Sequence, residues 1–150
     1  MILGIDHVGL ATNDAVGAGV FLAALGMRKA ESGVAEHYGV ACDFWEYPAL
    51  DNSAPGAPGG PAIETVCPIR DNSSVSERLA QNLFGLYHIA FRVDDIQSEI
   101  DRLRDSGFFI INAHPHDGAR SGMRVAFMYA KKPASLVVEL VQYQAGREAS

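Results

Sequence analysis

Apolar and amphipathic segments follow one another in the same order in the two halves of the chain. In the first half, the hydrophobic pattern predicts a strand over residues 2–12, a helix over 15–25, two strands between 27 and 47 with a turn near Ser32-Gly33, and a strand over 62–67. In the second half, it predicts a strand over 86–93, a helix over 96–106, and strands over 108–112, 124–130 and 136–143. Each half therefore follows the order β-α-β-β-β.

Polar residues and glycines mark the ends of the two long helices at equivalent places. Asn13-Asp14 and Asp94-Asp95 precede the helices, where a side-chain oxygen accepts a hydrogen bond from a free backbone N–H group. Gly26 and Gly107 follow the helices, and glycine readily adopts the left-handed conformation that ends a helix. The two halves therefore support each other's assignment.

The segment between the halves is predicted to be a connector, with a helix over 73–83. We divide the chain into a first module at 1–68, the connector at 69–83 and a second module at 84–150. A chain of 150 residues is long enough for both modules to share one core as a single structural domain. The predicted fold class is α+β, with a curved mixed sheet whose concave face holds a site.

Charge and composition narrow the classes of partner. The net charge of −6 and the pI near 5.2 disfavour nucleic acid, because nucleic-acid-binding domains usually have a concentrated basic face. The apolar runs are shorter than the roughly 20 residues of a membrane-spanning helix, and residues 1–5 contain no basic leader. Cys42 and Cys67 are too few for a disulfide scaffold and fit a reducing compartment. These features predict a cytoplasmic protein without membrane contact that acts on a small molecule.

The first predicted strand of each half carries one histidine, at His7 and His88, and each lies 19 residues before the glycine that ends the next helix. The last predicted strand of each half carries one carboxylate in an apolar run, at Glu64 and Glu139, 57 and 51 residues after the histidine. A repeat of this kind brings equivalent residues to one shared site. Two imidazoles and two carboxylates predict a divalent metal site that suits Zn, Ni, Co, Mn or Fe.

These four residues also have a purely structural interpretation. A single histidine on an apolar strand is more often a buried, hydrogen-bonded core residue than a ligand. Two histidines at equivalent places favour metal binding instead, together with two carboxylates in strands where an unpaired charge is costly. Glu64 is the weaker candidate, since it could face solvent from an edge strand.

The motifs around these residues resemble those of the vicinal oxygen chelate superfamily and, within it, the methylmalonyl-CoA epimerases. The resemblance covers nearly all of residues 4–143, and its motifs are IDHVGLA at 5–11, IETVCP at 63–68, DNSSV at 71–75, LYHIAFRVDDI at 86–96, RVAFM at 124–128 and VVELV at 137–141. It implies paired βαβββ modules around a divalent metal. The implied ligands are His7, Glu64, His88 and Glu139, a set that is also that of bacterial glyoxalase I. Members of the superfamily commonly pair, so the resemblance also implies a homodimer.

The resemblance implies a metal-dependent isomerase or epimerase acting on an acyl-CoA-like or other α-carbonyl substrate. Removing a proton next to a carbonyl leaves an enolate, which a divalent metal stabilises. Glu64 and Glu139 come from different modules, so one would remove a proton and the other would return it on the opposite face. Two alternatives stay open: a glyoxalase I-like lyase, and a protein of the same superfamily that binds or tailors an antibiotic or aromatic metabolite. A non-haem iron dioxygenase is disfavoured, because its site typically has a single carboxylate.

Cys42 departs from the epimerase pattern. Some epimerases carry a second, non-ligand glutamate at this place, after a Gly-Val pair, whereas here Gly39-Val40-Ala41 is followed by Cys42. A thiol there is expected to be a small buried residue rather than a base. Glu46 has the same strand parity and is a poorer second candidate. The existence of a second, non-ligand base therefore stays open.

Three further groups have two interpretations each. Phe44, Trp45 and Tyr47 precede a loop rich in Gly and Pro at 48–61, and they either fill the core or line an aromatic pocket. Four basic side chains in or beside the loops of the second half either contact a CoA substrate or are solvated, namely Arg120, Arg124, Lys131 and Lys132. The remaining group, His114, His116 and Asp117, is expected to be plain surface rather than a metal site.

Overall fold

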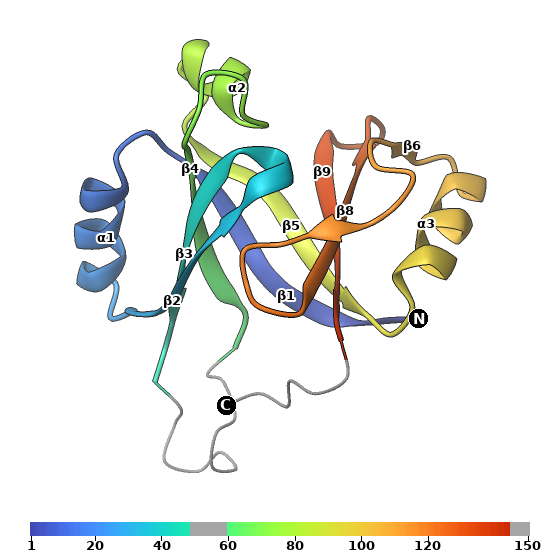
Figure 1. Ribbon diagram of the computed structural model, residues 1–150, viewed down its shortest axis with the longest axis horizontal. Coiled ribbons are helices and arrows are strands. Elements are labelled where there is room, and N and C mark those ends of the chain that lie inside the picture. The colour runs from blue at the N-terminus through green and yellow to red at the C-terminus, as the bar shows by residue number, and fades with distance from the viewer. Residues whose placement is uncertain (49–59, 145–150) are drawn as a thin grey trace.

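The computed structural model describes residues 1–48 and 60–144, which form one nine-stranded mixed sheet. The sheet is bent into a trough, with helix α1 (Ala15–Ala24) beyond one wall and helix α3 (Ile96–Asp105) beyond the other (Figure 1). This arrangement confirms the predicted α+β class and the curved sheet. The loop predicted at 48–61 lies mostly outside the described residues.

Five elements in each half repeat one order. The first half contains β1 (Ile2–Ala11), α1, β2 (Arg28–Ala35), β3 (Val40–Glu46) and β4 (Ala62–Pro68). The second half contains β5 (Gly85–Val93), α3, β6 (Phe109–Ile110), β8 (Met123–Ala130) and β9 (Leu136–Tyr143). Three short elements complete the structure: η1 (Glu36–Tyr38), α2 (Ser76–Ala80) and β7 (His116–Asp117).

The strands are ordered β2-β3-β4-β1-β5-β9-β8-β6, and β7 pairs with β8. β1 is parallel to β4, and β5 is parallel to β9. The other neighbouring strands are antiparallel, including β1 and β5 at the centre of the sheet. Each half therefore extends outward from the centre in the same pattern, as the repeat predicts. The module boundaries at residues 68 and 84 stay a prediction.

The two long helices begin and end where the sequence indicates. Asp14 and Asp95 each accept a hydrogen bond from the backbone N–H three residues later. Gly26 and Gly107 follow the helices with φ angles of 88° and 92°, which is the left-handed region. Within residues 1–48 and 60–144, no helix is long and apolar enough to cross a membrane.

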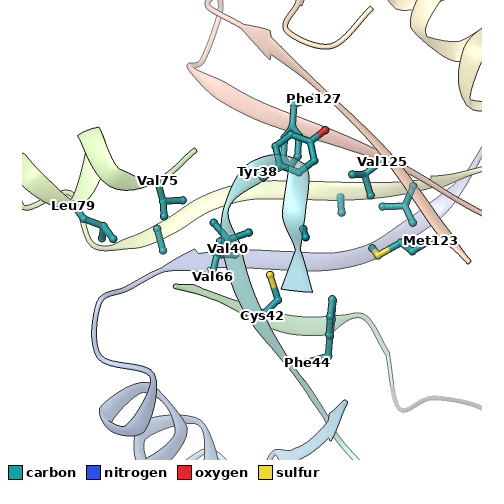
Figure 2. Close-up of a cluster of buried hydrophobic side chains, with 14 residues drawn as sticks. Tyr38, Val40, Cys42, Phe44, Val66, Val75, Leu79, Met123, Val125 and Phe127 are labelled. Carbon is teal, nitrogen blue, oxygen red and sulfur yellow. The ribbon is translucent and has the colours of Figure 1, made fainter. Parts of the chain in front are cut away.

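Buried side chains form two clusters, because alternate residues of each strand face opposite sides of the sheet. The cluster inside the trough includes Phe44 and Val125 (Figure 2). The second cluster lies between the sheet and α3 and includes Ile100 and Leu140. Since Leu140 faces α3, its neighbour Glu139 is placed on the opposite face, toward the trough.

The turn predicted near Ser32-Gly33 is wrong. β2 continues to Ala35, and the chain reverses through η1 instead. Gly33 has a different role, because a Cβ atom there would lie 1.8 Å from the carbonyl oxygen of Ala119. The glycine therefore permits close packing against a loop of the second half.

Two other predicted elements are shorter in the structure. The helix predicted over 73–83 is reduced to α2, and Asn82 shortly after it has a left-handed φ of 57°. The strand predicted over 108–112 is reduced to β6. It ends early because the N–H groups of Ile111 and Asn112 both donate to the carbonyl oxygen of Phe127, which interrupts regular pairing.

Candidate metal centre

The two halves place their histidine and glutamate in the same strand register. In the first half, Glu64 on β4 lies opposite Gly9, two residues beyond His7 on β1. In the second half, Glu139 on β9 lies opposite Ala90, again two residues beyond the histidine. Because side chains two residues apart share a face, each histidine and its glutamate point to the same side of the sheet.

The central pairing of β1 with β5 brings the four side chains together. The Nε2 atoms of His7 and His88 are 3.2 Å apart. Oε2 of Glu64 lies 3.1 Å from His7 Nε2 and 3.2 Å from His88 Nε2. Oε2 of Glu139 lies 3.0 Å and 2.9 Å from the same two nitrogens. One atom of each residue therefore faces a common point.

All four side chains are buried, with exposed fractions of at most 5% for the whole residues. Glu64 thus does not face solvent. Burial acts to lower the pKa of His7 and His88, but the charges of the two carboxylates outweigh it, so the pKa of each imidazole is raised. Burial acts to raise the pKa of Glu64 and Glu139, but the imidazoles outweigh it and the pKa of each carboxyl is lowered. The cluster is therefore strongly polar in an otherwise apolar trough.

The geometry fits a divalent ion. Donor atoms that each lie about 2.0–2.2 Å from one ion are roughly 3 Å apart at right angles and roughly 3.4 Å apart at the tetrahedral angle. The contacts between the imidazole nitrogens and the carboxylate oxygens are 2.9–3.2 Å. Oε2 of Glu139 is buried, and its contacts with the two imidazole nitrogens lack hydrogen-bond geometry. A buried carboxylate oxygen without a donor is costly, and a cation would satisfy it.

Gly9 makes room for this cluster. A Cβ atom at Gly9 would lie 2.2 to 2.6 Å from three atoms of the His88 ring. The equivalent position of the second half is Ala90, opposite His7. Position 9 therefore requires glycine, because the His88 ring from the other half packs directly against it.

Gly9→Ala is expected to move the His88 ring and to weaken divalent metal binding about 10–100-fold, which is typical when the orientation of a ligand is lost. Calorimetric titration with Co²⁺ measures the effect. Val8→Ala is the control, because it removes atoms from the neighbouring, half-buried residue of the same strand. An unchanged affinity in a folded Gly9→Ala protein would contradict the steric argument.

A pocket adjoins the cluster within the trough. Its walls include Tyr38, Cys42, Tyr87 and Phe127, together with Glu64, His88 and Glu139. Figure 2 shows Tyr38, Cys42 and Phe127 within the same group of buried side chains. The cluster of candidate ligands thus lies at the wall of an apolar and aromatic pocket, as expected for a small-molecule site.

The two candidates for a second base, Cys42 and Glu46, have different surroundings in the structure. Cys42 is buried in the pocket wall, where burial and the nearby Glu64 charge raise the pKa of its thiol well above the usual value. A thiol with a raised pKa stays neutral and is a poor base. Glu46 is held by Arg120, whose Nη2 atom lies 2.9 Å from Glu46 Oε1. This pairing engages Glu46 outside the metal cluster.

The three aromatic residues at the end of β3 lie on opposite faces of the sheet. Trp45 and Tyr47 face α1, and Phe44 faces the trough. A Cβ atom at Gly19 of α1 would lie 3.0 Å from the Trp45 ring, so Trp45 packs against this helix. The Tyr47 hydroxyl donates to the carbonyl oxygen of Leu25 at the end of the same helix. Phe44 is fully buried in the trough, and its ring meets that of His7 edge-on, with centroids 5.6 Å apart.

Two of the four basic residues are already paired. Arg120 is nearly buried and lies over the ring of Phe44, 3.9 Å from its centre. Arg124 donates to Asp117 and to the carbonyl oxygen of Pro115. Lys131 and Lys132 are exposed.

The loop histidines lie outside the cluster. His114 is exposed, whereas His116 belongs to β7 and stacks on His37 with centroids 3.4 Å apart. Among the described residues, His7, Glu64, His88 and Glu139 form the sole group of three or more donors placed for one ion.

Asp6 is a further residue of this region, and the repeat pattern does not indicate it. Its Oδ1 atom lies 2.8 Å from His7 Nδ1. The signal was a third carboxylate inside an apolar strand, directly before the proposed ligand His7. Its position also distinguishes the two halves, because Tyr87 precedes His88.

The family model of the Glyoxalase/Bleomycin resistance protein/Dioxygenase superfamily matches residues 6–127. The chain therefore belongs to this superfamily, whose fold is built from βαβββ modules as observed here. The matched residues begin within β1 and end within β8.

Within the superfamily, the similar proteins include acyl-CoA epimerases. The ethylmalonyl-CoA/methylmalonyl-CoA epimerase of Cereibacter sphaeroides is 33% identical over 82 residues, which is 53% of this chain and 60% of that protein. The uncharacterized protein YqjC of Bacillus subtilis is 29% identical over 84 residues, 56% of this chain and 59% of that protein. The chain therefore matches less than two thirds of the length of these curated relatives.

Structural similarity extends over nearly the whole chain. A variant of the Streptomyces coelicolor methylmalonyl-CoA epimerase, solved in complex with 2-nitronate-propionyl-CoA, has a TM-score of 0.81 and 27% sequence identity, and the alignment covers 99% of each chain. This protein is thus similar in overall structure to methylmalonyl-CoA epimerases.

Proposed function

We propose that this protein is a metal-dependent epimerase or isomerase that removes and returns a proton next to the carbonyl of an acyl-CoA-like substrate. The observation that carries the proposal is the convergence of two imidazoles and two carboxylates at the wall of an apolar pocket. The similarity to methylmalonyl-CoA epimerases supports the substrate class.

The proposed ligands of a divalent ion are His7, Glu64, His88 and Glu139. This donor set suits Co, Ni, Zn, Mn or Fe. When bound, the ion would act as a Lewis acid that stabilises the negative charge on the substrate oxygens as the proton leaves. The ligands belong to the first and last strands of both halves, so the site requires the two halves to pack together.

Glu139 is the proposed base. Its carboxylate is buried at the wall of the pocket, where the oxygen that does not face the ion can accept the proton of a bound substrate. Glu64 comes from the other half and also borders the pocket, which suits it to return a proton from a different direction. The neutral thiol of Cys42 does not take this role. The apolar walls exclude water and thereby strengthen the effect of each charge.

A glyoxalase I-like lyase is the second candidate. Cys42 lies where some epimerases carry a second carboxylate, and Glu64 completes a donor set that resembles that of bacterial glyoxalase I. A lyase of this type isomerises the hemithioacetal of an α-ketoaldehyde and a thiol. A homodimer stays a prediction from the family resemblance.

One experiment distinguishes these reactions. The purified protein is stripped with a chelator, reloaded separately with Co²⁺, Ni²⁺ or Zn²⁺, and incubated in deuterated water with (2R)- or (2S)-methylmalonyl-CoA. We expect deuterium at the carbon next to the carbonyl and conversion between the two epimers with reloaded protein only. Turnover of methylglyoxal hemithioacetal without activity on the thioester would favour the lyase. A protein that binds no divalent ion and exchanges no proton would contradict the proposal and favour a binding protein.

A further inference from the structure

The side chain of Asp6 contacts the ring nitrogen of His7 that the metal cluster does not use. Asp6 Oδ1 lies 2.8 Å from His7 Nδ1, whereas His7 Nε2 faces the two glutamates. The Asp6 side chain is only 1% exposed. A buried carboxylate thus lies against the His7 ring, on the side away from the proposed ion.

Asp6 is itself held from two other strands. Arg92 on β5 donates to Asp6 Oδ2 through Nε and Nη2, at 3.1 and 2.9 Å. The Tyr143 hydroxyl on β9 donates to Asp6 Oδ1 at 3.1 Å. Both carboxylate oxygens are therefore engaged by donors, so the group is fixed in place before any ion binds.

The second half lacks this arrangement. Tyr87 occupies the position before His88, and its ring meets the His88 ring edge-on with centroids 4.9 Å apart. His88 Nδ1 is buried and has no hydrogen-bond partner in the described part of the chain. The repeat that supplies equivalent ligands thus breaks at the residue behind each ligand.

We propose that Asp6 is a positioning residue that orients His7 for the metal ion, so that His7 is a fixed ligand and His88 an adaptable one. A carboxylate that accepts a hydrogen bond from Nδ1–H fixes the tautomer of the histidine and leaves the Nε2 lone pair for the ion. It also makes the imidazole a stronger electron-pair donor to the metal. This inference rests on the proposed metal centre. It goes beyond that centre by assigning different roles to two histidines in equivalent positions.

A purely structural role for Asp6 makes a different prediction. The pair formed with Arg92 joins β1 to β5, so its loss alone would lower the stability of the central strand pairing. Buried ion pairs often contribute little to stability, however, because removing charges from water is costly. The loss of a positioning residue must therefore change the metal affinity and the proton exchange of the His7 ring, and not solely the free energy of unfolding.

Asp6→Asn is expected to weaken Zn²⁺ binding about 10–100-fold, measured by competition with a chelating dye. Glu99→Gln is the matched control. Glu99 is also a buried carboxylate that receives two hydrogen bonds from one arginine, Arg102, but it lies on α3 and contacts neither histidine. Its replacement is expected to leave the Zn²⁺ affinity unchanged.

A second measurement follows the imidazole protons of the zinc-loaded protein by nitrogen-15 NMR. Exchange of the His7 Nδ1 proton with water is expected to become faster in Asp6→Asn, while that of His88 stays unchanged. Tyr143→Phe removes one donor to Asp6 but keeps the pair with Arg92, and it is expected to weaken Zn²⁺ binding about two- to tenfold. It decides the question if Asp6→Asn does not fold.

The outcomes separate the inference from the function on which it rests. Weaker Zn²⁺ binding and faster His7 exchange, with Glu99→Gln unaffected, support a positioning role. Wild-type affinity and exchange in folded Asp6→Asn, or in Tyr143→Phe if Asp6→Asn does not fold, would overturn it while the metal centre stands. A wild-type protein that binds no Zn²⁺, Co²⁺ or Ni²⁺ would overturn both.

Discussion

Glu139→Gln is expected to slow proton exchange at the substrate carbon about 10²- to 10⁴-fold, the range of a lost general base. Glutamine keeps the shape of the side chain and one oxygen that can bind the metal, but it cannot accept the proton as a carboxylate does. Glu139 is the candidate because its carboxylate is buried at the wall of the pocket. Deuterium incorporation into methylmalonyl-CoA, followed by mass spectrometry at saturating metal, measures the rate.

Glu46→Gln is the matched control for this experiment. Glu46 lies on β3 and pairs with Arg120 outside the metal cluster, so its replacement is expected to leave the exchange rate unchanged. The metal content of each protein must be determined, because a loss of metal from Glu139→Gln would by itself reduce the rate. Wild-type exchange in metal-loaded Glu139→Gln would exclude Glu139 as the base and leave that role to Glu64.

The repeat explains why the fold and the convergence of the four candidate donors could be predicted from the sequence. His7 and His88 lie in short apolar segments whose order recurs, so each half provides an independent check of the other. Strand alternation then determines that a carboxylate between apolar neighbours, as at Glu139, faces away from the helix side. These are local properties of the chain, and local properties are visible in a sequence.

The incorrect turn near Ser32-Gly33 had a non-local cause. Position 33 requires glycine because the backbone there packs against the carbonyl oxygen of Ala119 in the other half. No local sequence pattern indicates this contact. The same holds for Arg120, which was grouped with the solvated or CoA-binding cations but is nearly buried over Phe44. Contacts between residues far apart in the chain depend on how the halves pack, and the sequence does not display them.

Asp6 illustrates a signal that was present but ambiguous. A carboxylate beside a proposed ligand can bind the metal, support the ligand or form an ion pair. The structure resolves this choice by placing Asp6 at Nδ1 of His7 and by joining it to Arg92 and Tyr143. The strand order that brings β1, β5 and β9 together is what creates these contacts.

His7→Ala is expected to abolish stoichiometric metal binding, whereas the wild-type protein is expected to carry about one divalent ion per chain. The variant loses the proposed ligand whose Nδ1 atom contacts the buried carboxylate of Asp6. It also leaves Glu64 and Glu139 close together with a single imidazole between them, and breaking such a buried charge cluster is expected to lower the free energy of unfolding by about 3–5 kcal/mol. Elemental analysis measures the metal, and denaturant unfolding of the chelator-treated proteins measures the stability.

His114→Ala is the control for His7→Ala, since it removes an exposed histidine from the loop that precedes β7. It is expected to keep both the metal and the stability, because the loop lies outside the donor cluster. Metal that persists in His7→Ala but disappears from His114→Ala would move the site to the loop. Metal lost from His7→Ala alone, together with reduced stability of the metal-free protein, ties ion binding and the packing of the two halves to the same buried residues.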